Sequence, residues 1–247
     1  RTSSSRLQSK CLLYLDKNIR VIEHIILRCL GSGIEPILCT SQNRKDDILV
    51  KIAKELRINY FRGSEKNKIL RWYKCASTFD LGYFHTIDAD DLYFDPISIK
   101  KSIQLAKSKK ADLIHPSKIS RIGGASEGYT FSRKGIQKLN NNLKIYLYKD
   151  INKFDTEMID GFIKDAKLKQ HTFKGQPYEY KNKIRFTLDY KDDLKMFKIL
   201  FNKFGIYEKR QNINNYLRKN KKILKINYSK NKLWHNKQKN FKQPEKI

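Results

Sequence analysis

The sequence predicts an α/β fold in three layers, with helices on both sides of a central sheet. Two observations carry this prediction. Short apolar segments alternate with amphipathic helical patterns through the first half of the chain. The 247 residues are also 39% hydrophobic, which is enough to bury one substantial core.

The elements of the first half follow from local signals, taken in order. The segment Ile19–Leu30 has apolar residues at three- to four-residue spacing and stops at a Gly-Ser-Gly turn, which indicates a helix. A second helix, Asp46–Leu56, begins with acids that can cap it. By the same reasoning we expect strands at Glu35–Ser41, Gly82–Ala89 and Asp112–His115, and helices at Asn67–Ser77 and Pro96–Lys107.

The second half is less regular. The segment Asp192–Phe204 has a cap and a clear apolar stripe, which predict a helix. The Lys- and Asn-rich segment from Lys219 is expected to be a loosely attached arm or partly disordered. We further expect an edge strand at Tyr129–Phe131, helices at Ser132–Leu139 and Ile213–Leu217, a loop at Asn140–Asn142 and a strand at Ile184–Leu188. The expected division is a main domain of residues 1–210 and a basic C-terminal extension of residues 211–247.

The composition restricts the function classes. A net charge of +28 raises the question of nucleic acid, but the lysines are spread along the chain, so a nucleic-acid partner is disfavoured. A positive field would also attract nucleoside triphosphates. No apolar run reaches the ~20 residues of a membrane span and no signal peptide is evident, so we expect a cytoplasmic protein with no membrane partner. The four scattered cysteines lack CxxC spacing and are expected as reduced core thiols.

Residues 1–10 form a segment of small hydroxylated residues with spaced cations. Its hydroxyls and backbone N–H groups can donate to phosphate oxygens, while Arg6 and Lys10 can neutralise phosphate charge. Taken alone, a basic and serine-rich segment of this kind is more often disordered.

Two acidic motifs follow expected strands. Asp88–Pro96 places carboxylates at the carboxyl edge of the sheet, where open α/β sheets bind ligands and where hard oxygens could hold Mg²⁺. The alternative is a cluster of turn and helix-cap residues. In the second motif, Asp189 ends a strand, and Asp192 and Asp193 are expected to cap the following helix. Asp90 and Asp189 can meet only if their strands are neighbours.

These motifs, in this order, resemble those of the cytidylyltransferases, in particular the SpsF-like, CMP-Kdo synthetase-like and acylneuraminate cytidylyltransferase-like families. Residues 1–10 are similar to R-x-S-S-R-L-P-G-K, with Gln8 and Ser9 in place of Pro-Gly. The stretch around Asp90 is similar to T-x-D-x-P-L-I-D-P, and Arg185–Leu194 is similar to R-x-T-V-D-T-P-E-D-L. Further similar segments are A-T-S at Thr40-Ser41, F-R-G-S at Phe61–Ser64 and G-x-x-x-E ending at Glu127.

The resemblance spans roughly Arg1–Phe204 and implies a nucleotide-diphospho-sugar transferase-like (Rossmann-like) mixed sheet with a less regular C-terminal arm. In this family the first loop follows the first, central strand. We therefore expect an apolar segment of roughly five to eight residues before Arg1. The usual E-H-V-T-P-Y pattern is missing, and Asp155–Asp160 occupies its place.

The resemblance also implies roles for particular residues. Asp90 and Asp189 would hold Mg²⁺, and Arg6 and Lys10 would grip the triphosphate and stabilise the leaving pyrophosphate. Asp88 and Glu127 would face the acceptor. Asp88 could instead share the metal, turn the chain or serve as general base, a role that metal polarisation of the acceptor could replace, and Glu127 could be a surface carboxylate. The implied catalytic residues are Arg6, Lys10 and Asp90, and the implied nucleotide-binding residues are Arg1, Ser4, Ser5, Arg6, Lys10, Ser41 and Arg62.

The predicted activity is transfer of CMP from CTP to a sugar or sugar acid, with release of pyrophosphate, for surface polysaccharide or glycoconjugate biosynthesis. A homodimer is expected by resemblance alone. Two alternatives remain open from the sequence. One is a glycosyltransferase of the same fold, in which a DxD-like Asp88-Ala89-Asp90 binds the metal of a nucleotide sugar. The other is a basic protein that binds RNA or another polyanion.

Overall fold

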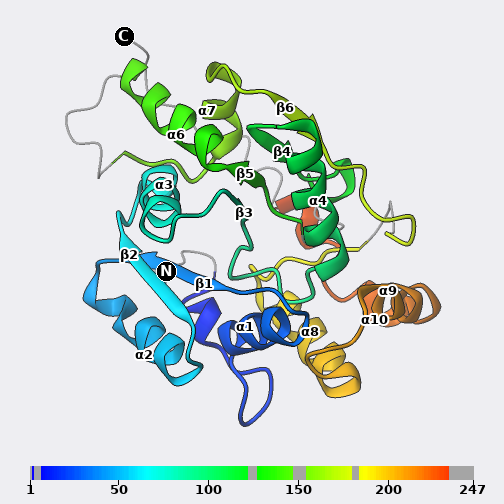
Figure 1. Ribbon diagram of the computed structural model, residues 1–247. Coiled ribbons are helices and arrows are strands. Elements are labelled where there is room, and N and C mark those ends of the chain that lie inside the picture. Colours follow the sequence, from blue (N-terminus) through cyan, green and yellow to red (C-terminus); the bar gives the residue numbers. More distant parts are fainter. Residues whose placement is uncertain (1, 3–6, 122–126, 147–153, 180–183, 234–247) are drawn as a thin grey trace.

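Two sheets lie at the centre of the computed structural model, which describes residues 2, 7–121, 127–146, 154–179 and 184–233 (Figure 1). In the first sheet, β1 (Ile37–Ser41) pairs in parallel with β2 (Asn59–Gly63). The second has the order β3-β5-β4-β6, formed by Tyr83–His85, Thr130–Ser132, Leu113–His115 and Gln170–Thr172. β5 is antiparallel to both of its neighbours, whereas β4 and β6 are parallel. The mixed α/β architecture expected from the sequence is therefore confirmed.

The helices of the first half match their sequence signals. α1 (Val21–Gly31) and α2 (Asp47–Glu55) lie on one side of the β1–β2 pair, and α3 (Lys68–Thr78) lies on the other (Figure 1). Asn67 caps α3 by accepting the N–H of Leu70 at 2.9 Å. Short 3-10 turns at Lys10–Leu12 (η1) and Arg44–Asp46 (η2) precede α1 and α2.

The helices around the second sheet also begin at side-chain caps. α4 (Pro96–Lys109) starts with proline, and the Asp95 carboxylate accepts the N–H groups of Ile97 and Ser98. The Ser132 hydroxyl caps α6 (Arg133–Asn142). This helix continues through Asn142, so the loop expected at 140–142 is wrong. The remaining short elements are α5 (Lys118–Arg121), η3 (Leu143–Ile145) and α7 (Ile159–Asp165).

Two strand predictions from the second half need correction. The strand expected at the sheet edge, β5, instead lies between β3 and β4. Glycine makes this close pairing possible, because a Cβ atom at Gly128 would lie 1.7 Å from the carbonyl oxygen of Thr86. The segment 184–188 is not a strand; its Leu188 N–H donates to the Asp90 carbonyl, and its apolar side chains are buried in the core.

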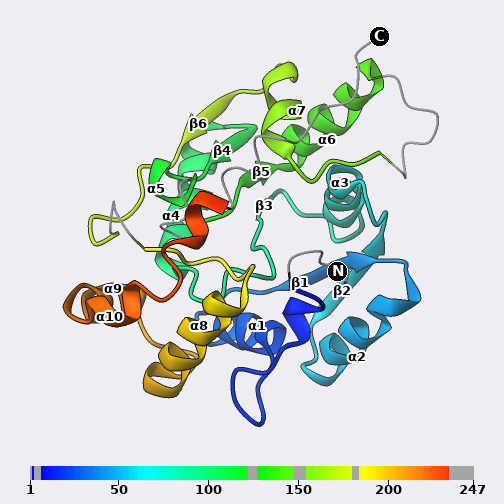
Figure 2. The same ribbon diagram turned by 180° about the vertical axis from the view of Figure 1, so that it is seen from behind.

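The C-terminal helices belong to the main core. α8 (Lys191–Phe204), α9 (Arg210–Lys219) and α10 (Lys221–Leu224) contribute to the same apolar cluster as α1 and the residues before α4 (Figure 2). Ile213 and Leu217 are fully buried, and Asn227 is also buried. The loosely attached arm expected after Lys219 is therefore wrong for the described residues up to 233. The boundary between residues 1–210 and 211–247 stays a prediction.

Buried arginines fasten these distant segments together. The guanidinium of Arg28 donates to the carbonyls of Phe94 (3.0 Å), Ile206 (2.6 Å) and Glu208 (2.8 Å). Arg210 donates to the carbonyl of Tyr93 and pairs with Glu179. These bonds hold the loop after β3 against the last third of the chain. In the described residues, no helix is both long and apolar enough to cross a membrane.

Candidate active site

Lys10 joins the two aspartates that the sequence singled out. Its ammonium lies 2.5 Å from an oxygen of Asp90 and 3.0 Å from an oxygen of Asp189. Burial alone would lower the pKa of Lys10, but the charges of the two carboxylates outweigh it and raise the pKa above its ordinary value. Three segments that lie far apart in sequence therefore meet at one charged centre.

The Asp189 carboxylate is fixed by a buried network. Its second oxygen accepts from Arg185 at 2.9 Å, and the same guanidinium pairs with Asp193 at 2.9 Å. The Asp193 carboxylate also accepts the backbone N–H groups of Asp189 and Tyr190, so it closes the turn that presents Asp189. Asn227 completes the network by donating to Asp193 and to the Arg185 carbonyl. The cap expected at Asp193 is present, and it positions the aspartate before it.

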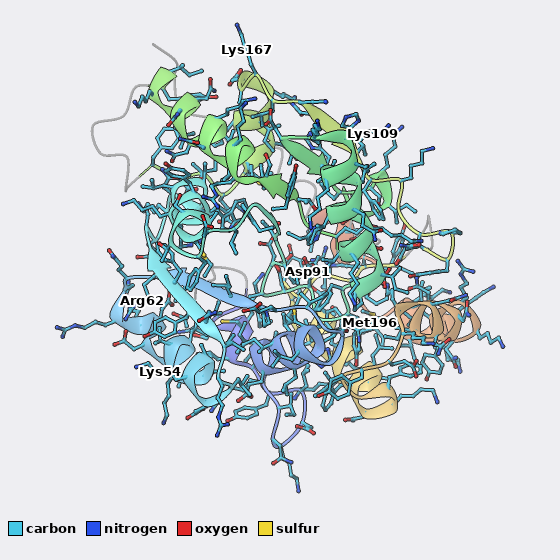
Figure 3. All side chains as sticks on the ribbon, viewed as in Figure 1. Lys54, Arg62, Asp91, Lys109, Lys167 and Met196 are labelled. Carbon is cyan, nitrogen blue, oxygen red and sulfur yellow. The ribbon has the colours of Figure 1, made fainter. Side chains whose placement is uncertain are left out.

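The Asp90 carboxylate lies in a turn with two further acids. One carboxylate oxygen from each of Asp88, Asp90 and Asp91 lies within 4.8 Å of the corresponding oxygens of the other two. Desolvation raises the pKa of Asp91 well above its usual value, and the charges of Asp90 and Asp88 raise it further. Figure 3 shows Asp91 between the β1–β2 pair and the second sheet. Repulsion among these acids would be relieved by a cation.

The donor set fits a hard divalent cation such as Mg²⁺. Carboxylate oxygens are the ligands that this ion prefers, and Asp90 and Asp189 offer them from two different segments. The ammonium of Lys10 donates to one oxygen of each of these carboxylates.

Ser41 lies in the interior and not on an open surface. It is fully buried, and its hydroxyl donates to Asp46 at 2.6 Å. The second oxygen of Asp46 accepts the backbone N–H of Thr2, so Ser41 is linked to the start of the chain through this carboxylate.

Arg62 lies away from Asp91 and its acidic turn, at the outer edge of β2 (Figure 3). Its guanidinium donates to the carbonyls of Ser41 and Asn43 at 2.9 Å each and pairs with Asp47 at 2.7 Å. Together with α2, Arg62 lines an open groove of about 530 Å³. These contacts brace the turn after β1.

Glu127 is directed inward. One oxygen accepts the N–H of Ser117 at 2.7 Å, and desolvation raises the pKa of the carboxyl group. The other oxygen is buried and has no hydrogen-bond partner in the described part of the chain. Asp88, by contrast, is exposed. Arg1, Ser4, Ser5 and Arg6 fall outside the described residues, so their predicted roles stay predictions.

Sequence reasoning missed the residues that hold the site together. In the sequence, Arg185 stands out only as part of a motif, Asp193 only as a cap, and Asn227 only as part of the Lys- and Asn-rich segment. Thr156 was also missed; it is fully buried, donates its N–H to the Lys66 carbonyl and accepts the N–H of Ile69. It thereby fixes segment 154–158 beside α3. Only the Arg-x-x-x-Asp-x-x-x-Asp spacing of residues 185–193 could have signalled part of this network.

Known proteins are similar to this chain over nearly its full length. No family model matches it. An uncharacterized protein of Methanocaldococcus jannaschii is 28% identical over 234 residues, which are 92% of this chain and 91% of that protein.

Three solved structures show the fold. A cytidylyltransferase from Leptospira borgpetersenii superposes with a TM-score of 0.77 at 18% identity, covering 91% of this chain and 93% of its own. A CMP:2-keto-3-deoxy-manno-octonic acid synthetase complexed with CTP has a TM-score of 0.59 at 11% identity, with coverage of 82% and 95%. Molybdopterin-guanine dinucleotide biosynthesis protein A from Archaeoglobus fulgidus has a TM-score of 0.55 at 13% identity, with coverage of 82% and 96%. The chain thus has the fold of these proteins, and its predicted resemblance to cytidylyltransferases is confirmed at the level of the fold.

Proposed function

We propose that this protein is a CTP-dependent nucleotidyltransferase that transfers CMP to a sugar or sugar acid and releases pyrophosphate. The observation that carries the proposal is the meeting of Asp90 and Asp189 on the ammonium of Lys10. Two carboxylates from separate segments, beside a cation on a third, are the parts that nucleotidyl transfer requires. The fold, shared with a cytidylyltransferase and with a synthetase complexed with CTP, supports cytidine as the base.

The reaction needs positioning and charge compensation more than covalent chemistry. An acceptor oxygen attacks the α-phosphorus of CTP, and the bond from that phosphorus to the pyrophosphate oxygen breaks. Lys10, together with Arg6, offsets the negative charge that develops on the leaving pyrophosphate. Mg²⁺ held by Asp90 and Asp189 would neutralise phosphate charge when bound.

Asp88 is the candidate general base. It is the exposed member of the acidic turn, so an acceptor hydroxyl can reach its carboxylate, one oxygen of which lies within 4.8 Å of oxygens of Asp90 and Asp91. The proton of the acceptor hydroxyl would pass to the Asp88 carboxylate as the new bond to phosphorus forms.

The acceptor would approach from the side of segment 154–160. Thr156 fixes this segment to α3, and the Tyr129 hydroxyl donates to Asp160 at 2.8 Å. The charge of Glu157 acts on Asp88, so the segment and the acidic turn face the same region. Polar side chains here suit the hydroxyl groups of a sugar. Glu127, which is directed inward, would act on the acceptor only by supporting the adjacent loop.

The test is pyrophosphate release by the full-length protein with Mg²⁺, using CTP, ATP, GTP or UTP and a panel of sugars and sugar acids. Selective release with CTP and one acceptor is the expected result. No release with any triphosphate, together with sugar transfer from a nucleotide sugar, would replace the proposal with a glycosyltransferase that uses Asp88 and Asp90. Steeply salt-dependent RNA binding without either reaction would support the polyanion-binding alternative.

A further inference from the structure

Two of the four cysteines lie together between β1 and α3. Cys39 is in the middle of β1, and Cys75 begins the last turn of α3. The Cys39 thiol donates to the carbonyl oxygen of Arg71, with 4.0 Å between sulfur and oxygen. Side chains on a helix point back toward its N-terminus, so the Cys75 side chain lies over the turn that holds this carbonyl. The two thiols are hydrogen-bonded to each other.

The two thiols of this pair differ in exposure and in acidity. Cys39 is partly exposed, whereas Cys75 is 7% exposed. The hydrogen bond from the Cys75 thiol, with the charge of Arg71, outweighs burial and lowers the pKa of Cys39 below its ordinary value. The same hydrogen bond, together with burial, raises the pKa of Cys75. Because the thiolate is the reactive form of cysteine, Cys39 is the nucleophile of the pair.

The other two cysteines provide a comparison within the same chain. Cys11 and Cys29 are each 1% exposed and belong to apolar core clusters. Desolvation raises the pKa of both thiols, that of Cys29 to about 12. Buried cysteines of this kind stay protonated and unreactive.

We propose that Cys39 and Cys75 form an oxidation site, at which a hydroperoxide such as hydrogen peroxide joins the two thiols in a disulfide between β1 and α3. The Cys39 thiolate attacks a peroxide oxygen, the O–O bond breaks, and Cys39 becomes a sulfenic acid. The leaving hydroxide takes up the proton that Cys39 released. The Cys75 sulfur then attacks the Cys39 sulfur, the S–O bond breaks, and the hydroxyl leaves as water with the Cys75 proton. The thiols lose two electrons, which reduce the peroxide to water.

The disulfide would fasten two elements that border the candidate site. β1 ends at Ser41, and α3 begins after Asn67, beside segment 154–158. A covalent link between them closes a long loop and so restricts the unfolded chain more than the folded one. Oxidation should therefore stabilise the fold. This inference does not depend on the proposed function, since it concerns the two thiols alone.

Peroxide treatment of the full-length wild-type protein tests the inference. The reduced protein is exposed to hydrogen peroxide, unfolded, alkylated and digested for mass spectrometry. The expected product is a pair of peptides joined through Cys39 and Cys75, with a fall in free thiols from four to two. The melting temperature should rise by about 5–10 °C and return with dithiothreitol. Four remaining thiols, a link between other cysteines, or oxidised Cys39 without a link would overturn the inference.

Single variants test the order of attack. Cys75→Ser should leave a sulfenic acid on Cys39 that dimedone traps, because no second thiol resolves it. Cys39→Ser should consume peroxide about tenfold more slowly than the wild-type protein. Cys29→Ser is the matched control and should keep both the link and the shift in melting temperature. An unchanged rate in Cys39→Ser would overturn the inference. If a variant does not fold, the mass spectrum of the wild-type protein decides.

Discussion

The two aspartates of the candidate site are held in different ways. The Asp189 side chain is 1% exposed and both of its oxygens are paired, one with Lys10 and one with the buried Arg185. The Asp90 side chain is 17% exposed and lies in a turn with two other acids. One carboxylate is fixed in advance by a network, whereas the other stands in a region of concentrated negative charge. We expect Asp189 to define the geometry and Asp90 to respond to the ligand.

The strongest test of this difference is Asp90→Asn. If Asp90 serves chemistry and contributes little to folding, turnover should fall about a thousandfold, with little change in the melting temperature. Pyrophosphate release and thermal unfolding measure the two effects. Asp80→Asn, which changes an exposed aspartate of the same chain, is the control. Retained turnover at saturating Mg²⁺ would rule out the assigned role.

Replacement of Arg185 should lower the stability of the fold, in contrast to replacement of Asp90. Arg185→Met leaves Asp193 buried without its cation and Asp189 paired with Lys10 alone, so the free energy of unfolding should fall by about 3–5 kcal/mol. Urea unfolding measures this loss. Asn227→Ala, which removes donors to Asp193 and to the Arg185 carbonyl, is the milder companion at about 1–3 kcal/mol. A fully stable Arg185→Met would contradict the view that this network fixes Asp189.

Lowering the pH should decrease the free energy of unfolding through protonation of His24. The ring donates to the carbonyl of Leu92 just after the acidic turn, and desolvation, with the charge of Arg28, lowers the pKa of His24 to about 3. An unfolded histidine has a pKa of about 6.5, so this contribution is complete above about pH 6.5 and is lost as the pH falls toward 3. At pH 5 the loss is about 2 kcal/mol.

Urea unfolding at pH 7 and pH 5 checks this expectation. The wild-type protein should lose more stability between the two pH values than His24→Gln, by about 2 kcal/mol. An equal loss in both proteins would show that His24 is not the titrating group.

The smallest effect is expected for Arg62. Its ion pair with Asp47 is partly exposed, so Arg62→Gln should lower the free energy of unfolding by about 1 kcal/mol or less. The KM for CTP should change by less than about threefold, because the guanidinium braces the turn after β1. A tenfold rise would instead support the direct nucleotide contact that the family resemblance implies.

Local signals predicted the helices and several strands of this fold. α1, α3 and α4 have caps or stops in their sequence, and the structure places them within a few residues of the prediction. The central position of β5 was not predictable from a three-residue pattern, because it depends on pairing with two distant strands. The packing of α10 was also missed, since a lysine-rich composition conceals the few apolar residues that it buries.

In the candidate site, too, local signals predicted some features, whereas long-range contacts determined the others. The pattern of acids after apolar segments marked Asp90 and Asp189, which come together in the structure, but it gave no sign that both would contact Lys10. The sequence could not reveal that Asp46 would receive donors from Thr2, since the two residues are 44 positions apart. Long-range hydrogen bonds leave no periodic signal. The metal and nucleotide roles of these residues stay predictions, as do the acceptor and the homodimer.

The contacts of Lys10 and Arg28 set an order of events during protein synthesis. Lys10 meets Asp189 across 179 positions, and Arg28 meets Ile206 across 178. At about 5–20 residues per second, the ribosome needs roughly 10 to 35 s to make a stretch of this length. The candidate site is therefore assembled only after the ribosome has made the chain as far as Asp189. An interrupted translation product that stops before Asp189 leaves both cations without these partners, and we expect it to be handled as an unfolded chain and not to persist as a partly active one.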